Sequence, residues 1–171
     1  MTKKYKLCKE HSISLADGTK LYQVKALKDF GRVVKGDLGG YIESGENLSQ
    51  GGNAWVYGNA KVYGDAKVYG DAKVFGTAKV YDHALVYGDA EVSGSAQVSG
   101  LAWISDDAKV SGHTWVSDSA DVSDHAQVSG HAWIYDDAWI SDSAEVSGHA
   151  QVSGHAQVYG NTRISGDNQV N

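Results

Sequence analysis

The 171-residue sequence contains no proline and a single cysteine, Cys8. Proline cannot donate a backbone N–H, so its absence suits a chain in which most amides belong to β-ladders. One cysteine excludes an internal disulfide framework and favours a reducing compartment. No apolar run approaches the roughly 20 residues that span a bilayer, and none follows residues 1–4 as in a signal peptide. We therefore expect a cytoplasmic protein that does not bind a membrane.

An aliphatic residue recurs at every sixth position from Val56 to Val170, twenty times without interruption. Alanine stands two residues before nearly every one, and the unit reads Ala-x-Val-(Tyr/Ser)-(Gly/Asp)-(Asp/Asn/His/Ser). This period matches neither an amphipathic helix nor a simple alternating strand. Alanine and the aliphatic residue would face inward on a short strand, x would face outward, and the last positions suit a turn. The pattern predicts a solenoid.

The hexad resembles the signature of left-handed parallel β-helices, which include bacterial acyltransferases and γ-class carbonic anhydrases. The resemblance implies triangular coils of three hexads, about 18 residues, stacked roughly 4.8 Å apart. The left-handed sense follows from the resemblance alone, because parallel crossovers are generally right-handed. We therefore predict an all-β, single-stranded left-handed parallel β-helix over residues 33–171, with regular hexads over 54–170.

Residues 1–32 lack the hexad and alternate weakly. Segments 5–7 and 13–15, a turn at 16–19 and a returning segment at 21–24 predict a β-hairpin. We expect this hairpin to cap the first coil, because the end of a solenoid exposes an apolar cross-section and unpaired strand edges.

Four segments after the hairpin resemble the N-terminal block of YdcK-like bacterial and prophage β-helices, which have been classed as transferases: Lys25–Phe30, Val34–Glu43, Asn47–Gln50 and Asn53–Val56. The resemblance implies an irregular first coil starting near Val33 or Val34, with Ile42 and Leu48 inward. It places the Gly51-Gly52 insertion at a corner, and it suggests a phage or prophage setting.

The tryptophans all immediately precede an inward aliphatic residue, so all five are expected to point outward: Trp55, Trp103, Trp115, Trp133 and Trp139. Counting by eighteen stacks Trp115 on Trp133 on one face and places Trp103 and Trp139 two coils apart on the next. We predict an exposed apolar patch made of Leu101, Trp103, Trp115, Trp133, Tyr135 and Trp139. Such patches mark interfaces, and Trp and Tyr are common binding hot spots. The alternative is ordinary aromatic decoration of a β-surface.

Six of the seven histidines share one slot, three residues after the aliphatic position: His83, His113, His125, His131, His149 and His155. Counting by eighteen aligns His113, His131 and His149 in a column that could bind a metal. However, the same slot elsewhere holds Asp, Asn, Ser or Thr, and His is among the residues enriched at positive φ. The zinc ligands of γ-class carbonic anhydrases include a pair of histidines five residues apart, whereas the closest pairs here are six apart, so the resemblance does not extend to a zinc site. We predict turn residues, with no metal and no cofactor.

Charge is unevenly distributed, with ten acidic and two basic residues in 101–171 and a net charge of −6 overall. Lysines alternating with tyrosines in the first half could suit nucleic acid: Lys61, Lys67, Lys73 and Lys79. They are predicted to lie on all three faces and to alternate with Asp65 and Asp71, so no basic stripe forms. A nucleic-acid partner is not favoured.

Hexapeptide acyltransferases interrupt their coils with a loop that reaches a neighbouring subunit, and no insertion breaks residues 54–170. We therefore assign no catalytic residue. The prediction is a non-catalytic binding or scaffold protein that self-associates or binds a protein partner through the aromatic patch or the last coil's edge, with a host factor as the partner in a phage setting. Two alternatives stay open: an acyltransferase with an intersubunit site near His113, His131 and His149, and a carbohydrate-binding module using Trp115 and Trp133.

Overall fold

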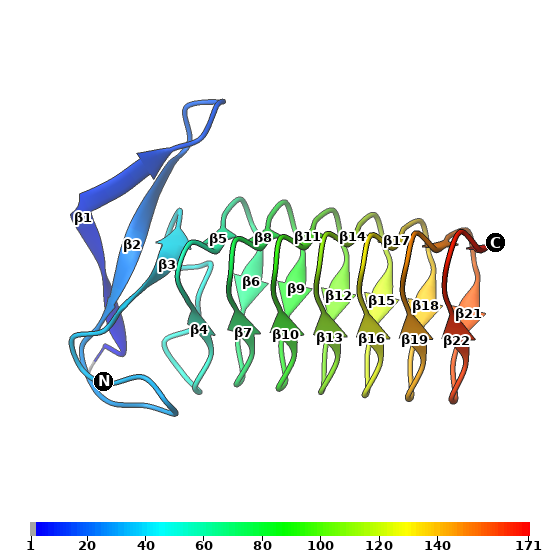
Figure 1. The fold of residues 1–171 in the computed structure, drawn as a ribbon. Helices are drawn as coiled ribbons and strands as arrows, with labels where there is room; N and C mark the ends of the chain where they lie inside the picture. The colour runs from blue at the N-terminus through cyan, green and yellow to red at the C-terminus, as the bar shows by residue number, and fades with distance from the viewer. Residues whose placement is uncertain (1–2) are drawn as a thin grey trace.

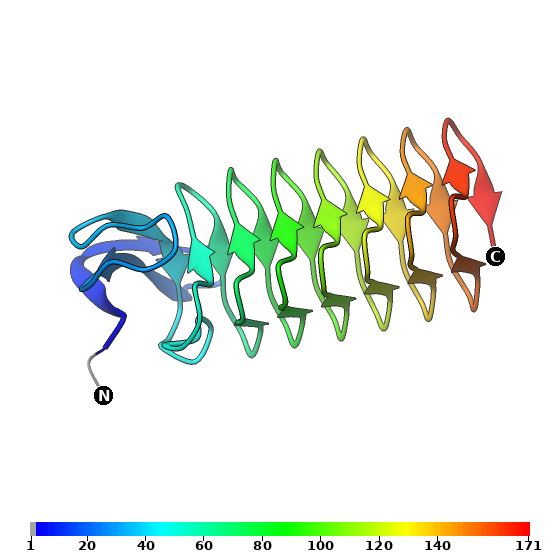
Figure 2. The same ribbon diagram turned by 90° about the horizontal axis from the view of Figure 1, so that it is seen from below.

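A computed structural model describes residues 3–171, and within them it has 23 β-strands and no helix. Short strands stack into a long triangular prism, with a β-hairpin at its N-terminal end (Figure 1). No helix in the described residues could cross a bilayer, since that part of the chain is built from strands and turns. A view from below shows the same regular succession of coils running to the C-terminal end (Figure 2).

Each coil contributes one two-residue strand to each of three parallel sheets, which we call faces 1, 2 and 3 in chain order. Face 1 carries β4 (Trp55–Val56), β7 (Lys73–Val74), β10 (Glu91–Val92), β13 (Lys109–Val110), β16 (Gln127–Val128), β19 (Glu145–Val146) and β22 (Arg163–Ile164). Face 2 carries β5 (Lys61–Val62), β8 (Lys79–Val80), β11 (Gln97–Val98), β14 (Trp115–Val116), β17 (Trp133–Ile134), β20 (Gln151–Val152) and β23 (Gln169–Val170). Face 3 carries β6 (Lys67–Val68), β9 (Leu85–Val86), β12 (Trp103–Ile104), β15 (Asp121–Val122), β18 (Trp139–Ile140) and β21 (Gln157–Val158).

The core consists of the alanine and aliphatic positions of the hexads, which are almost completely buried along the prism. Neighbouring coils pair in register at an offset of eighteen, as in Val116↔Ile134. Backbone amides join neighbouring coils in both directions: Trp115 N donates to Ala132 O of the next coil at 3.0 Å, and Val68 N donates to Asn47 O of the previous coil at 2.9 Å. The predicted all-β parallel solenoid with 18-residue coils is therefore confirmed, whereas its left-handed sense stays a prediction.

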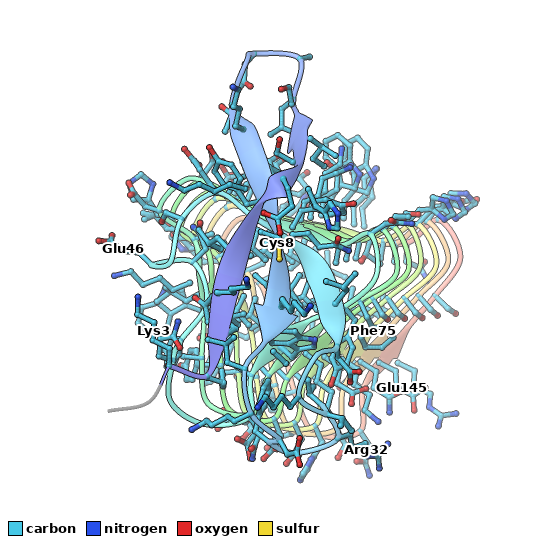
Figure 3. The ribbon with its side chains drawn as sticks, turned by 90° about the vertical axis from the view of Figure 1, so that its left-hand side faces the viewer. Lys3, Cys8, Arg32, Glu46, Phe75 and Glu145 are labelled. Carbon is cyan, nitrogen blue, oxygen red and sulfur yellow. The ribbon has the colours of Figure 1, made fainter. Side chains whose placement is uncertain are left out.

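The N-terminal hairpin closes one end of the prism. Strands β1 (Tyr5–Ser14) and β2 (Lys20–Ala26) pair antiparallel, and β2 pairs antiparallel with β3 (Leu38–Ile42). Strand β3 then starts the parallel ladder of face 2, with Ile42 opposite Val62. Seen along the prism axis, the hairpin stands across the end of the stacked coils (Figure 3). The structure thus contains the predicted hairpin, within residues 5–26. The division into a cap over residues 1–32, of which residues 1–2 lie outside the described part of the chain, and a β-helix over residues 33–171 stays a prediction.

The first coil contains two more residues than the regular ones, because Leu48 pairs with Val68 at an offset of twenty. The predicted inward placement of Ile42 and Leu48 is confirmed, since both are fully buried. The buried ammonium of Lys4 donates to carbonyl oxygens next to the extra residues, at 3.2 Å to Gly51 and 2.9 Å to Ala54. Burial lowers the pKa of Lys4 to about 8. This side chain replaces backbone partners that the irregular coil lacks.

The prediction that all five tryptophans point to solvent is wrong for Trp55, which is only 1% exposed. Its indole packs edge-on against the rings of Phe30 and Tyr5, with centroids 5.3 and 6.1 Å away. A Cβ on Gly39 would lie 2.8 Å from this indole, so β3 also presses on it. The hexad position is the same as for the other tryptophans, but the N-terminal segment covers it here.

The prediction that the histidine slot at the corners has positive φ is wrong. Left-handed backbone occurs one position earlier, at the Gly/Asp slot, and the described non-glycine residues with positive φ are all aspartates: Asp82, Asp106, Asp118, Asp124, Asp136 and Asp142. The histidines do lie in turns, but with ordinary φ. Each corner from face 1 to face 2 in the regular hexads instead has a glycine with φ between 59° and 75°: Gly58, Gly76, Gly94, Gly112, Gly130, Gly148 and Gly166.

The corner aspartates bond the coils to one another. Asp136 Oδ2 accepts the backbone N–H of Gly154 in the next coil at 3.0 Å, and Asp142 does the same for Gly160 at 2.9 Å. Asparagine and aspartate tolerate the left-handed conformation that this slot requires. Asp106, Asp124 and Asp142 form an acidic column along one edge of the prism, and turn geometry with amide capping explains it.

Replacing Asp136 by alanine should therefore lower the free energy of unfolding by about 2 kcal/mol, from the lost hydrogen bond and the left-handed alanine. Asp136→Asn keeps both properties and should change it by less than about 0.5 kcal/mol. Asp136→Gly removes only the hydrogen bond, so its loss of unfolding free energy should lie between those of the alanine and asparagine variants. Urea unfolding followed by circular dichroism measures all three, and an alanine variant as stable as the asparagine variant would contradict the capping role.

Candidate interaction surface

Face 2 presents a pair of stacked indoles. Trp115 and Trp133 lie opposite each other on β14 and β17, and their rings stack with centroids 5.5 Å apart and planes 12° apart. They are 45% and 48% exposed, respectively. The predicted stacking is confirmed. Because the rings stand parallel, their inner faces cover each other, and Gln97 and Gln151 lie on the next strands to either side.

A shallow concavity of about 370 Å³ runs beside the two indoles. Tyr135 and Gln151 line it together with Trp115, Trp133 and the carboxylate of Asp118. The apolar rings thus adjoin groups that can donate and accept hydrogen bonds, a mixture typical of recognition sites rather than of uniformly apolar packing surfaces.

Face 3 carries the other two exposed tryptophans, Trp103 and Trp139, on either side of Asp121 in the ladder. The two indoles therefore lie two coils apart, as predicted. The indole N–H of Trp139 donates to the Ser123 hydroxyl at 3.2 Å, so this side chain leans towards the coil of Asp121. Sequence reasoning did not single out Asp121, although counting eighteen in each direction finds both of its tryptophan neighbours.

The corner between faces 2 and 3 joins the two sets of indoles. Leu101, which is 57% exposed, lies in the turn between β11 and β12, and Tyr135 is half-buried just after β17. The six predicted residues thus occupy two adjoining faces and their shared corner; we call them the aromatic surface. Trp115 and Trp133 are in direct contact, while Trp103 and Trp139 are separated by the intervening coil. Their role in binding stays a prediction.

The predicted histidine column is present, at the corner between faces 1 and 2. The rings of His113 and His131, and of His131 and His149, stack with centroids 5.0 Å apart. Parallel rings direct their nitrogens along parallel planes instead of towards one point. Over residues 3–171, no group of three or more His, Cys, Asp or Glu side chains is arranged to hold a metal ion.

Other histidines pair with the aspartate one coil earlier. His83 Nε2 lies 3.3 Å from Asp65 Oδ2, and His155 Nδ1 lies 3.4 Å from Asp137 Oδ2. All four side chains are more than half exposed, so these ion pairs contribute little to stability. The pair Asp137–His155 recurs in the same form elsewhere along the prism and therefore has no special geometry for proton transfer.

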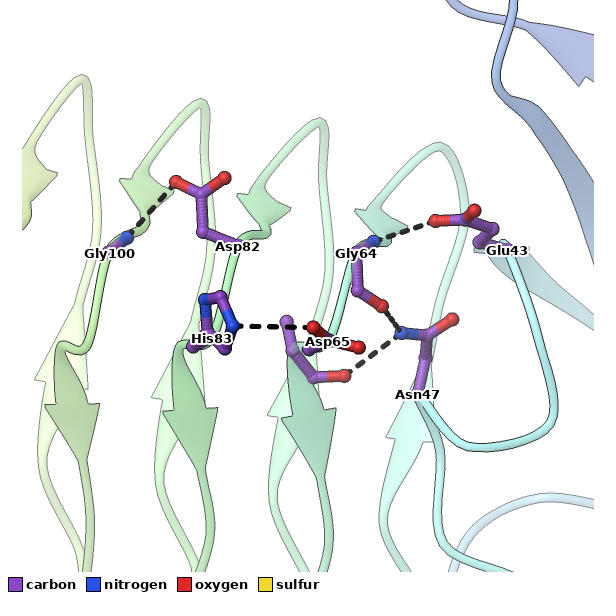
Figure 4. Close-up of polar contacts among 8 residues, drawn as sticks. Glu43, Asn47, Gly64, Asp65, Asp82, His83 and Gly100 are labelled. Atoms are coloured by element: carbon purple, nitrogen blue, oxygen red, sulfur yellow. Dashed lines mark hydrogen bonds and ion pairs between the residues drawn. The ribbon is translucent and has the colours of Figure 1, made fainter.

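A second concavity, of about 470 Å³, lies where the first coils turn from face 2 to face 3. Its polar groups already bond to the prism (Figure 4). Glu43 Oε2 accepts the Gly64 N–H at 2.7 Å, and the buried Asn47 amide donates to the Gly64 and Ala66 carbonyl oxygens. These contacts replace the ladder bonds of a regular corner, so the concavity is explained by the irregular first coil.

The remaining surface is polar and mixed in charge. The lysines of the first half lie on all three faces, as predicted, with Lys61 and Lys79 adjacent on face 2. Lys73 pairs with Glu91 at 2.9 Å on face 1. Tyrosine rings stack along the same coils, as in Tyr69 and Tyr87 at 5.0 Å. The Lys73–Glu91 pair and the stacked tyrosines are cross-strand contacts that stabilise a sheet, whereas Lys61 and Lys79 are like charges side by side.

Comparison with known proteins adds one match. The family described as the YdcK beta solenoid repeat matches residues 150–166, which contain β20, β21 and β22 and so span about one coil of the prism. No curated protein shows a significant sequence match. The matched segment is thus similar to the YdcK beta solenoid repeat, and the stacked 18-residue coils show that the chain is a β-solenoid of hexapeptide repeats.

Proposed function

We propose that this β-solenoid is a non-catalytic binding or scaffold protein, whose aromatic surface contacts a second copy of the chain or another protein. The observation that carries the proposal is the exposure of four indoles on two adjoining faces, at 45–48% of each side chain. Indoles bury large apolar areas and retain an N–H donor, which makes them frequent anchors of protein interfaces. In the phage or prophage setting suggested by the family resemblance, the other protein would be a host factor.

The backbone supports this role because it holds the indoles rigidly. Both strands that carry Trp115 and Trp133 are hydrogen-bonded to a coil on each side. A surface that is already ordered loses little conformational entropy when a partner binds. The prism can therefore present its side chains at fixed intervals without rearrangement.

Light scattering over a concentration series tests self-association directly. If a second copy binds, the wild type should form a dimer or larger oligomer, and Trp133→Ser should weaken it by about tenfold or more, as expected for a hot-spot residue. Gln97→Ser, at the same outward position on face 2, is the matched control and should have no effect. Trp133 is exposed and Gln97 is partly exposed, and circular dichroism checks that the prism is intact in both variants.

A wild type that stays monomeric would instead assign the surface to a different protein. Immobilised wild type, Trp133→Ser and Gln97→Ser would then be compared for the proteins they retain from a cell extract. Retention by wild type and Gln97→Ser, with loss on Trp133→Ser, is the expected result. Equal retention by all three, together with monomeric protein, would reject the proposal.

The concavity beside Trp115 and Trp133 favours carbohydrate binding as a second candidate, because Gln151 and Asp118 could bond hydroxyl groups there. A sugar ring would stack on the outer face of Trp133, since the inner faces of the pair are mutually covered. Quenching of tryptophan fluorescence by neutral oligosaccharides, lost in Trp133→Ser, would support this candidate over a protein interface.

A further inference from the structure

The prism carries three acidic residues at the outward position that precedes an inward aliphatic residue: Glu91, Asp121 and Glu145. Two of them are paired with a cation on an adjacent coil. Glu91 Oε1 lies 2.9 Å from Lys73 Nζ, and Glu145 Oε1 lies 3.1 Å from the Arg163 guanidinium. An outward carboxylate in this fold is thus accompanied by a basic residue eighteen positions away.

Asp121 is the exception. Its neighbours at eighteen residues in each direction are Trp103 and Trp139. Its side chain is partly buried, and its Oδ1 atom is shielded from solvent without a hydrogen-bond partner anywhere in residues 3–171. Burial raises the pKa of Asp121, the Ser123 hydroxyl opposes this, and the nearby carboxylates of Asp106 and Asp124 raise it further. The site is acidic, and its Oδ1 atom lacks a donor.

The groups around this carboxylate suit a flat organic cation. Trp103 and Trp139 lie on the strands before and after Asp121, whose backbones are about 9.6 Å apart, so an indole adjoins the carboxylate on each side. A guanidinium stacks on an indole face and donates several N–H groups to a carboxylate. Beside Trp139, a concavity of about 350 Å³ lined by Asp124 and Asp142 extends the acidic surface.

We propose that the cradle formed by Trp103, Asp121 and Trp139 binds an arginine side chain from a basic segment of a different protein. The guanidinium stacks on an indole and donates to Asp121 Oδ1. The two indoles are nearly half exposed and can change rotamer on a fast timescale, which opens access to the shielded oxygen. The inference rests on the proposed function, because it specifies the chemistry of the partner that meets the aromatic surface.

The charge and composition of the chain indicate why the arginine comes from elsewhere. Residues 101–171 contain ten acidic and two basic residues, so this part of the prism attracts basic segments. The chain has only two arginines, Arg32 and Arg163, and Arg163 is already paired with Glu145. Lysine would satisfy the charge but would lack the planar group that stacks on an indole.

The test uses the full chain labelled with ¹⁵N, whose indole N–H signals are assigned with single Trp→Phe variants. The probe is the blocked peptide acetyl-Gly-Arg-Gly-amide, and the same peptide with citrulline, which is neutral and nearly the same shape, is the control. We expect saturable shifts of the Trp103 and Trp139 signals with the arginine peptide. Asp121→Asn should weaken binding by about tenfold. Glu145→Gln, which removes the same charge from a paired carboxylate, should leave it unchanged.

Equal shifts with the citrulline peptide, equal shifts of all exposed indoles, or unchanged binding by Asp121→Asn would overturn the assignment. Movement of the Trp103 and Trp139 signals with protein concentration alone would also overturn it, since a second copy would then be the occupant. These outcomes are separable from the proposed function. If Trp133→Ser disrupts association while the arginine peptide does not bind, the interface stands and the cradle fails. If the peptide binds and association does not depend on Trp133, the reverse holds.

Discussion

Gly112→Ala is expected to lower the free energy of unfolding by about 2–4 kcal/mol, the combined cost of a left-handed alanine and of contact with the next coil. Gly112 has a φ of 75°, and a Cβ there would lie 2.6 Å from Gly130 O and 2.9 Å from Gly130 N. The same carbonyl accepts the His113 N–H at 2.7 Å, so moving the coils apart weakens a ladder bond. Urea unfolding monitored by circular dichroism provides the measurement.

Gly166→Ala is the matched control for this prediction. Gly166 lies at the same corner with a φ of 71°, but nothing lies within 4 Å of the position its Cβ would take. It should lose only about 1–2 kcal/mol, the cost of the left-handed conformation alone. Equal losses for the two variants would show that contact between stacked corners does not matter. The aspartates at the other corners have smaller φ values of 56–58°, consistent with a side chain needing a slightly different backbone there.

Trp55→Ala is expected to lower the free energy of unfolding by about 3–5 kcal/mol, because it removes a large side chain that is completely enclosed. The cavity would lie between the first coil and the N-terminal segment, where Phe30 and Tyr5 now pack against the indole. Trp133→Ala, at the same hexad position but 48% exposed, should cost about 1 kcal/mol or less. Thermal unfolding of the two variants measures the difference. Similar melting temperatures would refute the claim that the N-terminal segment is anchored by Trp55.

The interior of the prism was predictable because one rule governs it. Alanine and aliphatic residues recur at fixed positions, so their burial and the pairing of Val116 with Ile134 follow from counting alone. Counting failed where something outside the hexad intervenes. Trp55 occupies an outward position, yet residues far from the repeat cover it, and no periodicity contains that information.

The candidate site was only partly predictable for a related reason. The stacking of Trp115 on Trp133 follows from their spacing and is confirmed. The environment of Asp121 depends on which side chains lie on the coils before and after it, so its missing partner appears only when the two adjacent coils are compared. Positive φ occurs at the Gly/Asp slot and not at the histidine slot that follows it, and residue types alone do not separate the two slots because both carry turn-forming residues.

The constant offset of eighteen between paired residues limits how such a chain can change length. If one complete coil is deleted, the two flanking coils come into contact with each other. Every later side chain then remains on its original face. Deleting a single hexad keeps the core pattern but shifts all later residues to the adjacent face, which would place Trp133 beneath a different set of neighbours. Evolution can therefore adjust the spacing between two binding features in steps of roughly one inter-strand distance while preserving their direction.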